Sequence, residues 1–264
     1  MKDSLPEVWI ALSIGNSRWH WAWFQGTELQ ESWDSDRLSP SAIHQLTQTW
    51  QNGQITPNSF LPNLPLIPEL YLASVIPEQT SLWDNYPKLK KIALADLPLQ
   101  NLYPTLGIDR ALALLGAGEN WGWPILVIDA GTAMTFTGAN QHQQLIGGAI
   151  LPGLGLQFKS LYQGTAALPS TNLPLSIPHR WAANTPEAIQ SGIIYTVLAG
   201  IKDFITTWQQ EYPQSKIVLT GGDRPELLNY LQSQSPQLAA EMISDPNLIF
   251  WGMRSLYSAS KSIK

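Results

Sequence analysis

Cysteine is absent from the 264 residues of this chain. Its absence excludes disulfides, a catalytic thiolate and zinc sites built on cysteine. Only four histidines are present, and their spacing has no pattern typical of a zinc hydrolase. Basic residues are also few, at 15 lysines and arginines against 20 acids, which gives a net charge of −5 without a basic run. Nucleic acid is therefore not expected as a partner.

Long apolar segments are lacking as well. No uninterrupted apolar run approaches the roughly 20 residues that span a bilayer, and residues 1–6 lack the apolar core of a secretory signal. We therefore expect a soluble, cytoplasmic protein with no membrane partner. Tryptophan, in contrast, is abundant, and Trp19, Trp21 and Trp23 alternate along a predicted strand. Alternation places their indoles on one face, where core packing is favoured over an aromatic platform for a ligand.

Two stretches of the chain share one strand–turn–strand pattern. The apolar run 125–128 ends in Asp129, followed by a small-residue turn and an alternating run. Residues 9–17 match this frame, with Ser13 in the position of Asp129. Small residues let backbone N–H groups approach a phosphate closely. A single such turn would be read as an ordinary hairpin, but two predict a duplicated fold with two phosphate-binding turns.

Periodicity and turn residues predict an α/β protein. Strands are expected at residues 8–14, 18–24, 29–33, 69–75, 91–95, 125–128, 133–138, 143–150 and 216–219. Helices are expected to begin near residues 39, 77, 109, 154, 186, 225 and 248, and residues 52–68 are expected to form a loop. This order favours two lobes with mixed sheets, residues 1–108 and 109–264, with a cleft between them.

Six motifs in order resemble the type III pantothenate kinases, members of the actin-like sugar-kinase superfamily. The family's phosphate loop, D-x-G-N-[ST], matches residues 13–17 except at Ser13. The other matches are G-x-D-R at 107–110, D-x-G-T-A at 129–133, G-G-x-I-x-P-G at 147–153, a threonine at 185 and T-G-G at 220–222. The resemblance covers nearly the whole chain and implies duplicated actin-like (ribonuclease H-like) lobes.

The resemblance also implies a reaction, in which ATP phosphorylates pantothenate to 4'-phosphopantothenate in the first step of coenzyme A biosynthesis. Asp109 would be the general base, although any aspartate at this position could instead be a helix cap. Asp129 would bind a monovalent cation, K⁺ or NH₄⁺, and Mg²⁺ would accompany ATP. The implied ATP contacts are Ser13, Ile14, Gly15, Asn16, Ser17, Arg18, Trp19, His20 and Thr132. The implied pantothenate contacts are Tyr103, Gly107, Ile108, Asp109, Arg110 and, across the interface of a homodimer with a composite active site, Thr185.

Ser13 departs from the family pattern, in which an aspartate would help to hold Mg²⁺. A neutral hydroxyl is a poorer ligand for a hard cation. Three explanations are open: the ATP oxygens and water hold Mg²⁺ alone, another acid compensates, or the protein has become a non-catalytic binder of pantothenate or nucleotide. Because Asp109, Arg110, Asp129 and Thr185 occur together, retained activity is favoured. A kinase or phosphatase of the same superfamily with another acceptor is a third hypothesis.

Overall fold

The computed structural model describes residues 7–51 and 67–262, which divide into two compact units. The first unit extends to Pro98 and also contains Tyr103–Leu112 and the residues from Ile249 onward; the second contains Leu99–Leu102 and Ala113–Leu248. This division differs from the lobe boundary expected between residues 108 and 109, because the C-terminal helix belongs to the first unit.

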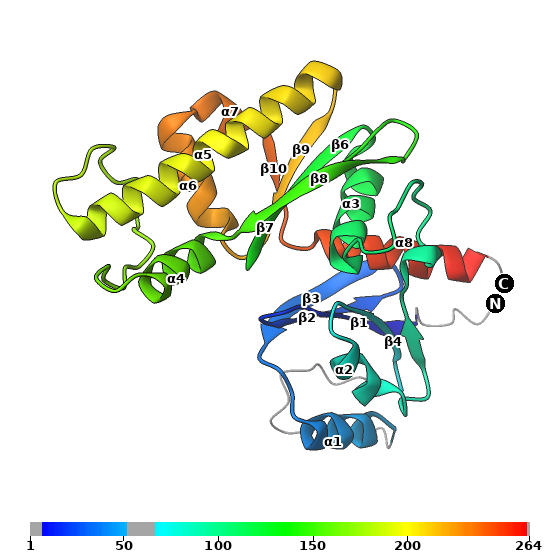
Figure 1. Cartoon of the computed structure of the whole chain (residues 1–264). Helices are drawn as coiled ribbons and strands as arrows, with labels where there is room; N and C mark the ends of the chain where they lie inside the picture. The colour runs from blue at the N-terminus through cyan, green and yellow to red at the C-terminus, as the bar shows by residue number, and fades with distance from the viewer. Residues whose placement is uncertain (1–6, 52–66, 263–264) are drawn as a thin grey trace. The chain divides into compact units, whose positions relative to one another are not determined.

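Each unit is built on a five-stranded mixed sheet (Figure 1). The first sheet has the order β3-β2-β1-β4-β5, and the second has the equivalent order β8-β7-β6-β9-β10. In both, the central strand is antiparallel to the next strand of the chain and parallel to its other neighbour. The strands are β1 (Val8–Ile14), β2 (Trp19–Gln25), β3 (Glu28–Ser35), β4 (Glu69–Ser74), β5 (Leu89–Lys91), β6 (Ile125–Ala130), β7 (Ala133–Ala139), β8 (Leu145–Pro152), β9 (Lys216–Thr220) and β10 (Met242–Ser244). The repeated topology confirms the duplicated α/β architecture.

Helices follow the strands in both units. They are α1 (Pro40–Gln51), α2 (Pro77–Thr80), α3 (Ile108–Trp121), α4 (Leu154–Gly164), α5 (Thr185–Glu211), α6 (Arg224–Gln234), α7 (Pro236–Glu241) and α8 (Leu248–Ser262), with 3₁₀ turns at Ser81–Trp83 and Leu94–Asp96. The strand predicted at residues 91–95 is wrong, because β5 ends at Lys91 and a 3₁₀ turn follows. Of the predicted loop 52–68, residues 52–66 lie outside the described residues.

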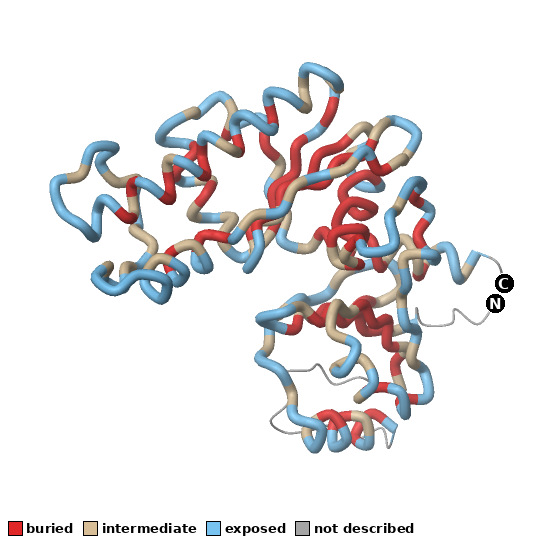
Figure 2. The backbone as a smooth tube through the Cα atoms, viewed as in Figure 1, coloured by how far each residue is buried: buried red, intermediate tan, exposed pale blue. Residues whose placement is uncertain are grey.

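Two of the three tryptophans of β2 are core residues, as predicted, and Trp23 is half-buried against the same cluster. Trp19 and Trp21 are fully buried, and both pack against Trp83 at ring-centroid distances of 6.0 and 5.8 Å. On the other face of the same sheet, Trp9 stacks with Tyr257 of α8. Figure 2 shows the buried positions concentrated on the central strands. Both faces of the first sheet are thus covered, which fixes the end of β1 and the turn that follows it.

The second unit has its own core, in which α5 packs against the sheet. Buried residues of α5 at helical spacing, Ile189, Ile193, Val197 and Ile201, join side chains from the central strands in one cluster. Among the described residues, α5 alone is long and apolar enough to cross a membrane by length and composition. Its buried stripe is what a core helix of a folded domain presents.

Lys261 connects α8 to the starts of the interior strands β1 and β4 of the first sheet. Its ammonium binds Glu69 at 3.3 Å and also binds Glu7. Burial lowers the pKa of Lys261, but the hydrogen bonds from its ammonium to these two carboxylates outweigh burial and raise the pKa above its ordinary value. The bridge therefore stabilises the charged lysine at neutral pH.

Candidate active site

The first phosphate-binding turn joins β1 to β2. Ser13 is buried near the end of β1 and lies opposite His20 in the antiparallel register. The N–H of Gly15 donates to the carbonyl of Arg18 at 3.1 Å and closes the turn, while Asn16, Ser17 and Arg18 are exposed. Because these three residues are exposed, this side of the turn is accessible to a phosphate group.

Charged side chains surround this turn. The Nδ1 atom of His20 lies 2.6 Å from Oδ1 of Asp34, and a guanidinium nitrogen of Arg18 lies 3.7 Å from the other oxygen of this carboxylate. Arg37 donates to the carbonyl of Asn16. Three basic groups and one acid thus border the turn. Sequence reasoning included Arg18 and His20 but missed Asp34 and Arg37, which lie far from the motif in the sequence.

The second turn joins β6 to β7 and contains Asp129. An added Cβ on Gly131 would lie 3.2 Å from Oδ1 of Asp129, and one on Gly221 would lie 2.5 Å from the same atom. Gly221 also has a φ of +93°, which favours glycine. The carboxylate therefore lies in a space that both glycines must leave open, close to the backbone of two strand ends.

Backbone hydrogen bonds tie this second turn to its neighbours. The N–H of Gly153, before α4, donates to the carbonyl of Thr132 at 2.9 Å. The N–H of Asp223, before α6, donates to the carbonyl of Ala130 at 2.9 Å. The family motifs at 147–153 and 220–222 thus converge on the turn that carries Asp129 and Thr132.

The Asp223 carboxylate adds a side-chain connection that sequence reasoning missed. It accepts hydrogen bonds from the backbone N–H groups of Leu154 and Gly155, at the start of α4. Burial raises the pKa of Asp223 above its ordinary value, and the negative charge of Glu226 raises it further. The two N–H groups lower this pKa but do not cancel the rise. The acid directly after T-G-G was the available signal, because helix N-termini favour carboxylates.

The G-x-D-R motif forms the start of α3. Oδ1 of Asp109 accepts the N–H of Arg110 at 2.8 Å, and an added Cβ on Gly107 would lie 2.4 Å from the same oxygen. Arg110 is buried, and its guanidinium donates to the hydroxyl of Tyr103 at 3.0 Å. Arg110 is thus a buried side chain of this motif and not a surface residue. The motif and Tyr103 form one polar cluster, with glycine required beside the carboxylate.

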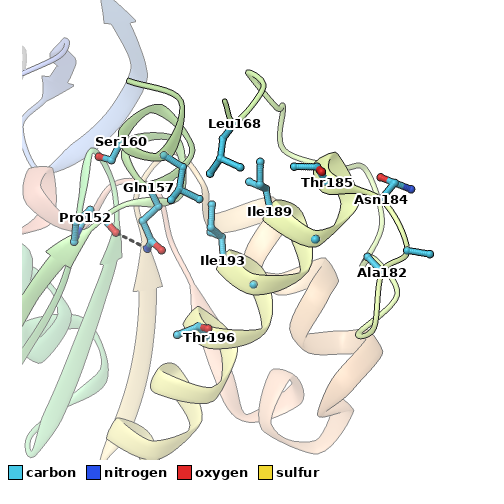
Figure 3. A pocket seen from close by; sticks show the side chains of 14 residues that line it. Pro152, Gln157, Ser160, Leu168, Ala182, Asn184, Thr185, Ile189, Ile193 and Thr196 are labelled. Atoms are coloured by element: carbon cyan, nitrogen blue, oxygen red, sulfur yellow. Dashed lines mark hydrogen bonds between the residues drawn. The ribbon is translucent and has the colours of Figure 1, made fainter. Parts of the chain in front are cut away.

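Thr185 lies elsewhere, at the first residue of α5. The preceding Asn184 caps this helix, because its side chain accepts the N–H of Glu187 at 3.0 Å. A mostly apolar cavity of about 820 Å³ extends along α4 and α5, with Thr185, Ile189 and Ile193 in its lining (Figure 3). The exposed threonine is thus placed beside an open apolar surface.

The predicted site residues fall into two groups. Residues 13–20, Tyr103 and Gly107–Arg110 belong to the first unit, and Asp129, Thr132 and Thr185 belong to the second. In the described part of the chain, no three His, Asp or Glu side chains are grouped to hold a metal.

Comparisons with known proteins agree over almost the full chain. Residues 9–207 match the family of type III pantothenate kinases. A type III pantothenate kinase from Nostoc sp. is 52% identical, with 96% of this chain and 95% of the relative covered. One from Synechocystis sp. is 44% identical, with 100% and 95% covered.

Solved structures show the same fold at lower identity. A conserved putative Baf family transcriptional activator from Campylobacter jejuni is 22% identical, with a TM-score of 0.63 over 96% of this chain and 99% of that one. An activator of 2-hydroxyisocaproyl-CoA dehydratase from Clostridium difficile, solved with ADPNP bound, is 10% identical, with a TM-score of 0.52 over 97% and 96%. These likenesses concern the fold alone.

Proposed function

The chain belongs to the type III pantothenate kinase family, and we propose that the cluster of Tyr103, Asp109 and Arg110 carries the chemistry of its reaction. The activity of the family is phosphorylation of pantothenate by ATP, the first step of coenzyme A biosynthesis. The observation that supports the site is the Asp109 carboxylate, held by the Arg110 N–H beside a glycine that leaves it room.

Asp109 is the proposed general base. A hydroxyl attacks poorly at neutral pH, so a positioned acceptor for its proton speeds the reaction. As the pantothenate hydroxyl oxygen bonds to the γ-phosphorus, its proton passes to the carboxylate and the bond from the γ-phosphorus to the β-phosphate oxygen breaks. Oδ1 is engaged by Arg110, so we assign the proton to the other carboxylate oxygen. The buried Arg110, steadied by Tyr103, offsets negative charge at this point.

The two glycine-bearing turns are the proposed phosphate sites. In the first turn the exposed residues Asn16, Ser17 and Arg18 are the proposed phosphate contacts, and in the second turn Thr132 is, since positioning and charge stabilisation dominate phosphoryl transfer. Mg²⁺, when bound with ATP, neutralises charge on the β- and γ-phosphates. Asp129 is the proposed ligand of a monovalent cation, K⁺ or NH₄⁺, because Gly131 and Gly221 leave its carboxylate room near backbone oxygens.

The base assignment can be tested by ADP release with pantothenate, with and without K⁺. Asp109→Asn is expected to lower kcat by roughly two to four orders of magnitude, the usual effect of losing a general base. Near-normal turnover in this variant would contradict the assignment. A wild-type protein that binds ATP without turnover would instead favour a non-catalytic regulator.

We further propose a cytoplasmic homodimer in which Thr185 completes the partner's site. The support is the exposed Thr185 beside the apolar cavity along α4 and α5. Chains with Asp109→Asn and chains with Thr185→Ala, each impaired alone, should regain part of the activity when mixed. An active monomer in sedimentation would contradict this arrangement, and cell fractionation tests the location.

A further inference from the structure

The turn between β6 and β7 is enclosed by backbone from the ends of two other strands. After β8, a Cβ on Gly153 would lie 2.0 Å from the carbonyl oxygen of Gly131, so a larger residue would collide with the turn. After β9, a Cβ on Gly221 would lie 2.5 Å from the carbonyl oxygen of Ala130. The position of Thr132 in this turn therefore depends on where these two neighbouring segments lie.

Glycine at position 153 leaves helix α4 without a side-chain cap of its own. Gly153 is the N-cap residue of α4 and has no side-chain oxygen to accept the first N–H groups of the helix. Asp223 binds these groups instead, because its carboxylate accepts the N–H of Leu154 and the N–H of Gly155. Asp223 is itself the N-cap residue of α6, yet its side chain makes no cap hydrogen bond there. The carboxylate thus caps a helix that follows another strand.

This bridge closes a ring of contacts around the turn. The N–H of Asp223 donates to the carbonyl of Ala130 at 2.9 Å, and the N–H of Gly153 donates to the carbonyl of Thr132 at 2.9 Å. Within α4, the side chain of Gln157 donates to the last carbonyl of β8 at 2.8 Å, which holds the end of that strand to the helix (Figure 3). Asp223 is therefore joined to the turn directly through its backbone and indirectly through α4.

We propose that Asp223 is a positioning residue for the kinase reaction: its carboxylate holds the start of α4 and so keeps Thr132 in place for a phosphate of ATP. The inference rests on the proposed function of Thr132 as a phosphate contact. Without the carboxylate, two N–H groups of α4 lose their acceptor, and α4 is held less firmly against the turn. The turn then adopts its binding arrangement for a smaller fraction of the time, and the apparent Kd for ATP rises as that fraction falls.

Hydrogen exchange tests the structural part of the proposal in the protein without nucleotide. Asp223→Ala should speed amide exchange at residues 153–156 and also at the turn, residues 130–133, because loss of the bridge promotes local opening of both segments. Asp223→Asn keeps one acceptor oxygen and should have a smaller effect on both. Faster exchange at residues 153–156 alone would show that the bridge does not act on the turn, and would overturn the proposal.

Calorimetric titration with ATP tests the functional part. Asp223→Ala should raise the Kd for ATP about three- to tenfold, the size expected when the net contribution of one hydrogen bond is lost, and Asp223→Asn should lie between this variant and the wild type. The KM for ATP should follow the Kd, whereas the KM for pantothenate should change little, since Tyr103, Asp109 and Arg110 belong to the first unit. A general loss of stability would not separate the two substrates in this way.

Ser39→Ala is the matched control, because it removes a helix cap in the other unit. The hydroxyl of Ser39 accepts the N–H of Ala42 at 3.2 Å at the start of α1. Loss of this cap should lower the melting temperature by about 2–4 °C, and ATP binding measured well below the melt should be unchanged. A folded Asp223→Ala variant with an unchanged Kd for ATP would overturn the proposal.

Turnover of the wild-type protein is measured in parallel, so that the proposed function and this inference can fail separately. A wild-type protein that releases ADP with pantothenate, together with an Asp223→Ala variant of normal ATP affinity, would overturn the inference alone. A wild-type protein that neither binds ATP nor releases ADP would overturn both.

Discussion

Gly107→Ala tests whether the proposed base depends on its glycine neighbour. The added methyl would lie 2.4 Å from Oδ1 of Asp109, whereas ordinary contacts begin at 3.4 Å, so the carboxylate must move by about 1 Å. That movement also breaks the hydrogen bond of 2.8 Å from the N–H of Arg110. Misplacement of a reacting group by about 1 Å can cost roughly a hundredfold in rate.

We therefore expect kcat to fall by about ten- to a hundredfold, with the KM for ATP nearly unchanged. The fold should persist, because the clash involves the end of a side chain and replacing glycine by alanine at a helix cap costs about 1 kcal/mol. Steady-state ADP release and a thermal melt measure the two effects. Gly200→Ala is the control: its methyl would meet no described atom within 4 Å, and α5 should gain up to about 1 kcal/mol.

A double mutant separates displacement of Asp109 from other damage. If alanine at position 107 acts only by moving this carboxylate, Gly107→Ala should add nothing to the loss caused by Asp109→Asn, since coupled residues are not additive. A full additional loss would show that Gly107 acts elsewhere. Normal kcat in a folded Gly107→Ala protein would refute the reasoning from the contact.

Tyr103→Phe removes the hydroxyl that binds Arg110. It should raise the KM for pantothenate severalfold and leave the KM for ATP nearly unchanged, and equal changes in both KM values would contradict the placement of Tyr103 at the pantothenate site. Gly252→Ala would bring a methyl within 2.2 Å of the Leu112 backbone carbonyl, so we expect loss of roughly 2 kcal/mol or more in denaturant unfolding. Lys261→Met removes the ammonium between the carboxylates that start β1 and β4 and should cost about 1 kcal/mol at pH 7. Because its folded pKa is raised, this contribution should be complete below the ordinary lysine pKa of about 10.4 and disappear as the pH rises above it, which unfolding across pH measures.

The sheets were predictable where strands are long and central. The alternation in β2 and the apolar run of β6 indicate the two-residue period of a strand and the side chains that are buried. Both strands lie within one or two residues of the expected bounds. The edges were not predictable in this way. Ile92 and Leu94 resemble a strand, yet pairing with β4 ends at Lys91, because the chain turns into the 3₁₀ turn at Leu94–Asp96 although β4 continues to Ser74.

The candidate site also contains residues that a local motif predicts and residues that only the tertiary structure reveals. The G-x-D-R motif is local, so its spacing alone could place Asp109 and Arg110 at a helix start, and the structure adds their contacts with Gly107 and Tyr103. Asp34 could not be found this way, and for Asp223 the acid after T-G-G did not indicate which segment its carboxylate binds. Each acts on a segment distant in the chain, and only the register of β2 with β3, or the convergence of three strand ends, brings it there.

The two duplicated turns share one topology but differ in the side chain at the end of the central strand. In both, a glycine follows a buried central strand and the next residue is exposed, which is typical of a phosphate-binding turn. The side chain at the strand end decides what a phosphate meets there. Under the proposed function, the Asp129 carboxylate would need a cation between it and a phosphate, since two anions repel. Ser13, opposite His20 in the equivalent register, carries no charge, so the same topology places different charges at its two strand ends.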